Sequence, residues 1–176
     1  MKQFNSKTTQ LAQGAIIAAL YVALTYAQAV IFPGSTSMAV QFRVSEMMTL
    51  LAVFTPAAIP GLTIGCAIAN LVALGSLPLD VFIGSLATLL ATICMYKLRS
   101  VRFKGLPLLA CLMPAIFNGI IVGWEIEFFF IEGPFNFMSF LIQGGLVALG
   151  ELGVCFTLGL LFVKAVEKRG LEKYFK

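Results

Sequence analysis

Long apolar stretches, separated by short segments that are charged or rich in proline and glycine, make up most of this chain. A helix needs about 20 mostly apolar residues to cross the roughly 30 Å hydrocarbon core of a bilayer. The pattern predicts one integral membrane domain over residues 1–176, an all-α bundle of six transmembrane helices. We place these helices at residues 9–32, 42–55, 58–74, 79–96, 106–124 and 137–163.

The second and third helices share a short stretch of chain. Residues 42–74 must supply both helices and the turn around Pro56 and Pro60 between them. We therefore expect at least one of the two to be short, or to pack within the bundle rather than face lipid along its whole length.

The basic residues indicate how the helices are oriented. Every Lys and Arg except Arg43 falls in one of three groups, which are Lys2 and Lys7, then Lys97, Arg99, Arg102 and Lys104, then Lys164, Lys168, Arg169, Lys173 and Lys176. Because cytoplasmic loops of membrane proteins carry an excess of Lys and Arg, we expect a multi-pass protein of the cell membrane with both termini cytoplasmic. The loops expected outside, residues 33–42, 75–79 and 125–136, then carry Glu125, Glu127 and Glu132.

Composition narrows the function classes. With 60% hydrophobic and 11% charged residues, the chain lies outside the range of soluble domains. The net charge is +4, and the basic residues border the apolar stretches. There they can interact with anionic lipid, so we expect no nucleic-acid binding. The four cysteines lie in apolar runs without Cys-x-x-Cys spacing, and there is no histidine. We expect these cysteines to be packing residues, and we expect no metal and no other cofactor.

The first apolar stretch also has features of a cleaved signal peptide. Lys2 and Lys7 precede it, and Ala27-Gln28-Ala29 has the small-x-small form of a cleavage site. The apolar run is long for a signal peptide, so we favour a retained helix.

Polar side chains inside the predicted spans are costly and usually face a cavity or a partner. In the sixth span, Gly144, Ala148, Glu151 and Cys155 fall on one helical face, and Glu151 is its one ionisable group. This face either lets a neighbouring helix pack closely around a bonded Glu151 or leaves room for a ligand beside it. We favour the ligand, because a carboxyl group at membrane depth is usually functional.

The fifth span adds Asn118 and Glu125, whose spacing puts them on one face. We expect them to line a cavity that opens to the outside, with Glu127 near its mouth. Trp124 either anchors the helix at the membrane interface, which is the commoner role, or stacks on a planar ligand.

Other polar positions have two interpretations each. Asn70 either bonds a neighbouring helix or faces the cavity. Asp80 is either an N-cap or first-turn acid of the fourth helix, which we favour, or a ligand group. At the start of the second span, Arg43 and Glu46 either compensate each other's charge or form, with Gln41, one lip of a binding site.

Missing motifs exclude other activities. No G-x-x-x-x-G-K-[ST] loop is present, so the chain cannot itself harness ATP. Without histidine and without a G-x-S-x-G serine, an enzyme would have to rely on Glu or Asp chemistry. We therefore expect that the protein is not an enzyme.

Small residues mark one face of the first span. Ala15, Ala19, Ala23 and Ala27 recur every four residues, and such faces let helix backbones approach closely in lipid. The face either packs within the same bundle or docks a separate membrane protein. An importer without an ATP site would need such a partner.

Several segments resemble the QueT family, which belongs to the substrate-binding S-components of energy-coupling factor (ECF) transporters. The resemblance covers about residues 9–165 and is carried by Gln41-Phe42-Arg43-Val44-Ser45-Glu46, Thr55-Pro56-Ala57-Ala58-Ile59-Pro60-Gly61, Gly65-Cys66-Ala67-Ile68-Ala69-Asn70, Gly84-Ser85-Leu86-Ala87-Thr88-Leu89-Leu90, Phe117-Asn118 and Leu149-Gly150-Glu151-Leu152. S-components are similar in size, have six helices with both ends inside, and commonly carry an Ala-x-x-x-Ala surface on the first helix.

The resemblance implies a subunit that captures a queuosine precursor outside the cell, a 7-deazaguanine such as queuine or its aminomethyl or nitrile precursor. It implies delivery inward together with a transmembrane coupling subunit, which would dock on the alanine face, and two ATPase subunits. The alternatives are an S-component for another vitamin and a self-sufficient proton-coupled carrier of a small nucleobase-like solute.

Roles for the candidate residues follow from that substrate. A guanine-like base presents adjacent N–H donors, and a carboxylate accepts both in a bidentate pair, a role we expect of Glu151. Asn118 and Asn70 are the amide candidates. Glu125 or Glu127 would pair with an aminomethyl cation, and Arg43 with Glu46 would order a lid.

Overall fold

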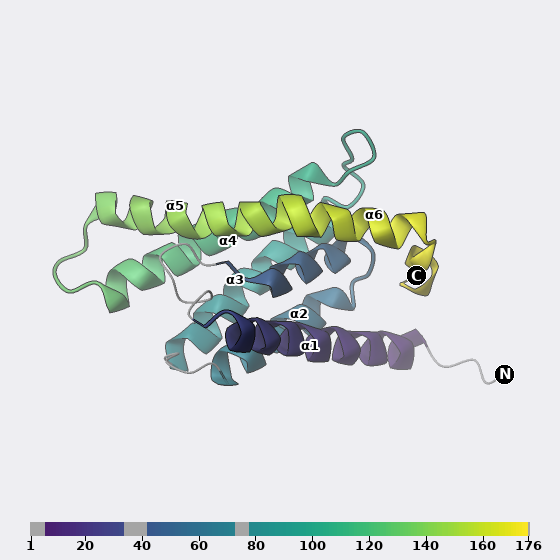
Figure 1. The fold of residues 1–176 in the computed structure, drawn as a ribbon, viewed down its shortest axis with the longest axis horizontal. Coiled ribbons are helices and arrows are strands. Elements are labelled where there is room, and N and C mark those ends of the chain that lie inside the picture. The colour runs from purple at the N-terminus through teal and green to yellow at the C-terminus, as the bar shows by residue number, and fades with distance from the viewer. Residues whose placement is uncertain (1–5, 34–41, 73–77, 176) are drawn as a thin grey trace.

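The computed structural model describes residues 6–33, 42–72 and 78–175, which form a bundle of helices (Figure 1). In chain order the elements are α1 (Ser6–Ile31), η1 (Val44–Val53), α2 (Ala58–Val72), α3 (Pro78–Lys97), α4 (Leu108–Glu125), η2 (Ile126–Phe130), α5 (Phe137–Val154), η3 (Cys155–Gly159), α6 (Leu160–Lys168) and η4 (Leu171–Tyr174). Of these, η1 and η4 are 3-10 helices, and η2 and η3 are π-helical turns. The prediction of an all-α fold is confirmed.

Four stretches are long and apolar enough to cross a membrane, namely Lys7–Ile31, Pro78–Lys97, Leu108–Phe130 and Phe137–Lys168. They correspond to the first, fourth, fifth and sixth predicted spans. Helices also occupy the second and third predicted positions, but Val44–Val53 and Ala58–Val72 are shorter. A 3-10 helix of 10 residues rises about 20 Å, which is less than the hydrocarbon thickness.

The fifth helix is longer than predicted. Through the π-helical turn η2 it continues from α4 to Phe130, past residue 124, and so absorbs the first half of the predicted loop at residues 125–136. The predicted span ended ahead of Glu125 and Glu127 because both were assigned to an outer loop. Both side chains are only 3% exposed and lie within the helix.

Glycines bring two helix pairs into close contact. A Cβ atom on Gly61 of α2 would lie 2.6 Å from the backbone oxygen of Gly14 on α1. A Cβ atom on Gly144 of α5 would lie 2.4 Å from the backbone oxygen of Gly119 on α4. Larger residues would force these helices apart. The second contact holds the polar face of α4 against that of α5.

The 3-10 helix η1 lies inside the bundle. Its residues from Ser45 to Val53 are buried, with the exception of Met47, and it contacts α1, α3 and η3. The polar first turn of η1, with Ser45 and Glu46, is thereby placed among the longer helices.

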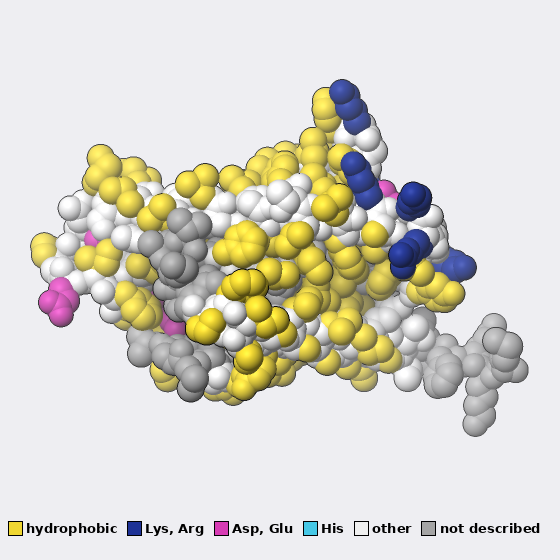
Figure 2. Space-filling model, in the orientation of Figure 1, with side chains coloured by type: hydrophobic (Ala, Val, Ile, Leu, Met, Phe, Trp, Pro, Cys, Tyr) yellow, Lys and Arg dark blue, Asp and Glu magenta, His cyan; other side chains and the backbone are white. Residues whose placement is uncertain are grey.

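The two ends of the bundle differ in charge. The start of α1 and the end of α6 lie at the same end (Figure 1), and Lys and Arg side chains gather there (Figure 2). An ion pair between Arg102 and Glu167 joins the segment after α3 to α6 at this end. We call it the basic end, and the opposite one the far end.

Candidate functional site

Five polar residues from different elements meet inside the bundle, and we call them the buried polar cluster. They are Arg43 ahead of η1, Glu46 on η1, Asn70 on α2, Asn118 on α4 and Glu151 on α5. Arg43 is half-buried, whereas the exposed fractions of the other four lie between 2% and 6%.

Glu151 and Asn118 form the contact between α4 and α5. The Nδ2 atom of Asn118 donates to Oε1 of Glu151 at 3.0 Å. The other oxygen of Glu151, Oε2, is buried and has no hydrogen-bond partner among the described residues. One side of the carboxylate is thus fixed, while the other can still accept a hydrogen bond.

Glu46 supplies a second carboxylate of the same kind. The hydroxyl of Tyr21 on α1 donates to Oε1 of Glu46, and Oε2 is buried without a partner in the described part of the chain. Glu46 and Glu151 are near enough to act on each other electrostatically. The cluster therefore presents two carboxylates, each with one available oxygen.

Arg43 is held by Asn70 rather than by Glu46. Its Nη1 atom donates to Oδ1 of Asn70 at 3.0 Å, and Nδ2 of Asn70 donates to the backbone oxygen of Asp80 at 3.0 Å. The amide of Asn70 thus joins Arg43 to α3, which favours the helix-bonding interpretation. The guanidinium acts electrostatically on both Glu46 and Glu151, and its buried Nε atom has no partner among the described contacts.

Sequence reasoning missed the inward face of α1. Besides Tyr21, the hydroxyl of Thr25 donates to Oγ of Ser45 at 2.8 Å. The side-chain amide of Gln28 donates to the backbone oxygen of Phe42 and accepts from the backbone N–H of Val44 at 2.6 Å. These bonds hold the start of η1, and with it the backbone on either side of Arg43.

A signal for that face was present in the sequence. Tyr21, Thr25 and Gln28 are spaced at i, i+4 and i+7, so they share one helical face within an apolar stretch. Polar groups at such positions must find partners within the protein.

The far end holds two further buried carboxyl groups. Glu125 interacts with the carboxyl group of Asp80 in the first turn of α3. Glu127 instead accepts from the backbone N–H of Asn136 at 3.0 Å, just ahead of α5. Trp124 is 43% exposed and stacks on Phe128 with 5.2 Å between ring centroids, which favours its role as an interfacial anchor.

The remaining predicted residues lie apart from the cluster. Gln41 falls outside the described residues. Ala15, Ala19, Ala23 and Ala27 are exposed on α1. The packing against α2 is made instead by Gly14 and Ala18, next to Gly61 and Gly65. The alanine face is therefore available at the surface of the bundle.

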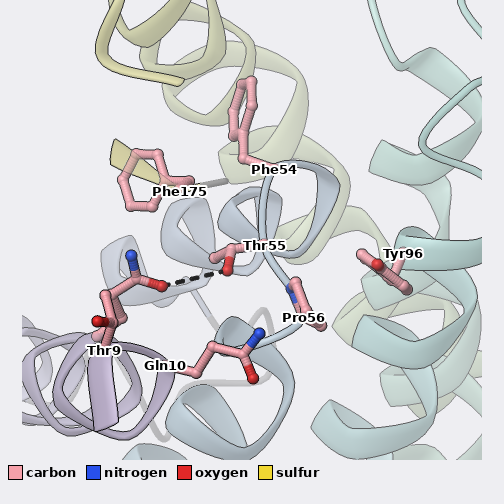
Figure 3. A pocket seen from close by; sticks show the side chains of 8 residues that line it. Thr9, Gln10, Phe54, Thr55, Pro56, Tyr96 and Phe175 are labelled. Carbon is pink, nitrogen blue, oxygen red and sulfur yellow. Dashed lines mark hydrogen bonds between the residues drawn. The ribbon is translucent and has the colours of Figure 1, made fainter. Parts of the chain in front are cut away.

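A pocket of about 420 Å³ lies at the basic end, and we call it the basic-end pocket. Figure 3 shows Thr55 at its centre, Phe54 and Phe175 above it and Tyr96 to the right. The backbone oxygen of Tyr174 accepts from Nε2 of Gln13 at 2.6 Å. The lining residues are Thr9, Gln10, Gln13, Phe54, Thr55, Pro56, Tyr96 and Phe175, and none of them is charged.

The buried polar cluster combines hydrogen-bond acceptors and donors. Carboxylate oxygens accept, the guanidinium and amides donate, and each partner is held by hydrogen bonds to another helix. No group of three or more His, Cys, Asp or Glu side chains in the described residues is arranged to hold a metal ion.

Comparison with known proteins finds a family and a relative. The model of the QueT transporter family matches residues 11–168. The queuosine precursor transporter QueT of Lactococcus lactis subsp. cremoris (strain MG1363) is 34% identical over 157 residues, which cover 86% of this chain and 88% of that protein. Among solved structures, none matches this chain.

Proposed function

Because this chain belongs to the QueT transporter family, we propose that it captures a queuosine precursor, a 7-deazaguanine, in the buried polar cluster. The family and the relative are transporters, so the chain is a transporter and not an enzyme. Within that class, we propose the role of substrate-binding S-component of an ECF importer.

The observation that carries the proposal is the buried, unpartnered oxygen of Glu151. A polar atom buried without a hydrogen bond is costly, so it persists where a ligand or another partner satisfies it. The ring N–H and exocyclic amine of a guanine-like base lie side by side. A carboxylate has enough lone pairs to accept both of these donors while keeping the bond from Asn118.

Other groups of the cluster suit the rest of the base. The buried Nε–H of Arg43 can donate to the base carbonyl, which is the one acceptor beside the two donors. Asn118 turns its Nδ2 group towards Glu151, which leaves its carbonyl oxygen as an acceptor for a further N–H group. Asn70 then acts through Arg43, whose guanidinium it holds.

The basic end is proposed to face the cytoplasm, because Lys and Arg collect on the inner side of membrane proteins. The start of α1 and the end of α6 would then both be inside, and the far end, with Glu125 and Glu127, would face outside. Substrate would enter from the far end.

A membrane partner is proposed to dock on the exposed alanine face of α1. Small side chains let a second helix approach closely, and the chain has no nucleotide-binding loop of its own. An ATP-driven module, with a transmembrane coupling subunit and two ATPases, would supply the energy.

The proposed substrate binding is tested by calorimetry on the purified chain in detergent. The panel is queuine with its aminomethyl and nitrile precursors, and guanine, thiamine, riboflavin and biotin serve as controls. We expect binding confined to the 7-deazaguanines. Binding to another vitamin alone would mean that this vitamin, and not a 7-deazaguanine, is the substrate. Uptake by the chain alone in liposomes, driven by a pH gradient, would mean that the protein is a proton-coupled carrier and not an S-component.

The proposed docking of a membrane partner is tested with Ala19→Leu. The larger side chain on the alanine face should block close helix approach and lower cellular uptake, while ligand affinity of the purified chain stays the same. The matched control is Ala165→Leu, which enlarges an exposed alanine on α6. Unchanged uptake in Ala19→Leu would remove the alanine face as the docking surface.

A further inference from the structure

The buried acidic groups outnumber the cations near them. Glu46, Glu125 and Glu151 are each between 2% and 5% exposed, and in the described residues Arg43 is the cation that acts on them. One guanidinium can neutralise one carboxylate. A buried carboxyl group either takes up a proton or is paired with a cation, and a bound ligand can bring that cation.

The two acidic groups of α4 at the far end have different surroundings. Glu127 accepts from the backbone N–H of Asn136, and the side chain of Asn136 in turn caps the first turn of α5. Glu127 therefore shapes the connection between α4 and α5. Both glutamates have one buried oxygen, Oε1 of Glu125 and Oε2 of Glu127, without a hydrogen bond to any described residue. What distinguishes Glu125 is that it lies beside a second carboxyl group, that of Asp80.

Two adjacent carboxyl groups suit a primary ammonium. When both are ionised they repel each other, and an ammonium group between them removes that repulsion while offering three N–H donors to their oxygens. A bare metal ion would need more ligands, and no group of three or more such side chains in the described part of the chain is arranged around one.

The spacing along α4 matches the length of such a ligand. Asn118, which bonds Glu151, and Glu125 lie on one face of α4, two helical turns or about 10 Å apart. That distance is comparable to the length of a bicyclic base with a one-carbon amine arm. If the donor edge of the base lies at Glu151, the amine at the end of the one-carbon arm lies near Glu125.

We infer that Glu125, together with Asp80, binds the ammonium group of the substrate, so that the protein selects 7-deazaguanines with an aminomethyl arm over the neutral nitrile. The inference rests on the proposed function, because it uses the same base site, and it assigns Glu125 rather than Glu127 to the cation. Glu125 is thus a specificity-determining residue.

The test is calorimetry on the purified full-length chain with the aminomethyl and the nitrile 7-deazaguanine. A hydrogen bond to a charged group contributes about 1.5–3 kcal/mol, so we expect wild type to bind the aminomethyl compound about tenfold or more tightly than the nitrile. Glu125→Gln should remove that preference by weakening the aminomethyl compound alone. Glu125→Asp, which keeps the charge, should retain part of it.

The matched control is Glu132→Gln, which neutralises an exposed carboxylate on the same side and should leave both affinities unchanged. Equal binding of both compounds to wild type would overturn the inference and leave the proposed function intact. Binding of neither would overturn the proposed function itself.

Two other outcomes would also overturn the inference. Equal losses for both compounds in Glu125→Gln would mean that Glu125 only supports the fold. A requirement for Na⁺, seen when choline replaces it in the buffer, would mean that the carboxyl pair holds a metal ion instead. If Glu125→Gln does not fold, which thermal unfolding would show, the wild-type preference and Glu125→Asp decide the question.

Discussion

The buried polar cluster and the basic-end pocket both contain polar side chains, but they differ in charge and burial. The cluster contains a guanidinium and two carboxylates, and Glu46 and Glu151 are 2% and 5% exposed. The basic-end pocket is a hollow of about 420 Å³ lined by uncharged residues. Polar groups near water cost little, whereas buried carboxylates with a free oxygen need a partner. The cost of burial, rather than the volume of a hollow, is therefore the reason why we propose the cluster as the place of substrate recognition.

The largest effect is expected from Glu151→Gln. The substitution keeps the shape but removes the charge and turns one acceptor into a donor, which faces the donors of a guanine-like edge. Loss of a charge-assisted pair should weaken binding of the 7-deazaguanines about tenfold or more in calorimetry. Glu132→Gln is the control at an exposed position. Unchanged affinity in Glu151→Gln would remove Glu151 from the binding site.

A smaller effect is expected from Gly84→Ala on α3, which perturbs the cluster without touching a charge. The new Cβ atom would lie 2.6 Å from Nδ2 of Asn70, so the amide must move away from Asp80 and loosen its hold on Arg43. Loss of about one hydrogen bond, roughly 1 kcal/mol, should weaken binding several-fold.

The matched control for that change is Gly153→Ala on α5, where a Cβ atom would meet no other atom within 4 Å. It should leave affinity unchanged. If Gly84→Ala and Gly153→Ala bound substrate equally well, then Arg43 would not depend on Asn70 for its position.

Helical periodicity predicted part of this arrangement. The shared face of Gly144, Ala148, Glu151 and Cys155 follows from the repeat of an α-helix. Ala148 is half-buried and the other three residues are buried. The pairing of Asn118 with Glu151 needed one more fact, the close approach of Gly119 and Gly144. A single sequence does not give that contact, because it depends on which helices are neighbours.

The hydrogen-bond partners of Arg43 and Glu46 and the burial of Glu125 depend on tertiary contacts. Arg43 and Glu46 act on each other electrostatically, as their spacing predicts. Their hydrogen bonds, however, go to Asn70 and Tyr21, which are on helices that contact η1. Glu125 resembles a loop residue by its charge, but burial beside Asp80 allows the helix to continue. Charge patterns predict solvation only where no protein covers the side chain.

The smallest effect on binding is expected at the basic-end pocket, from Phe175→Ala. Phe175 stacks on Phe54 with 6.2 Å between ring centroids, and aromatic pairs contribute about 0.5–1.5 kcal/mol beyond area burial. Without this contact, hydrogen exchange of residues 171–175 should become faster. Affinity for the substrate should stay within about twofold, because distant sites without shared partners act independently. A loss of affinity as large as that of Glu151→Gln would instead show that the basic-end pocket and the buried polar cluster are coupled. The C-terminal segment would then take part in holding the substrate, and substrate recognition would not be confined to the cluster.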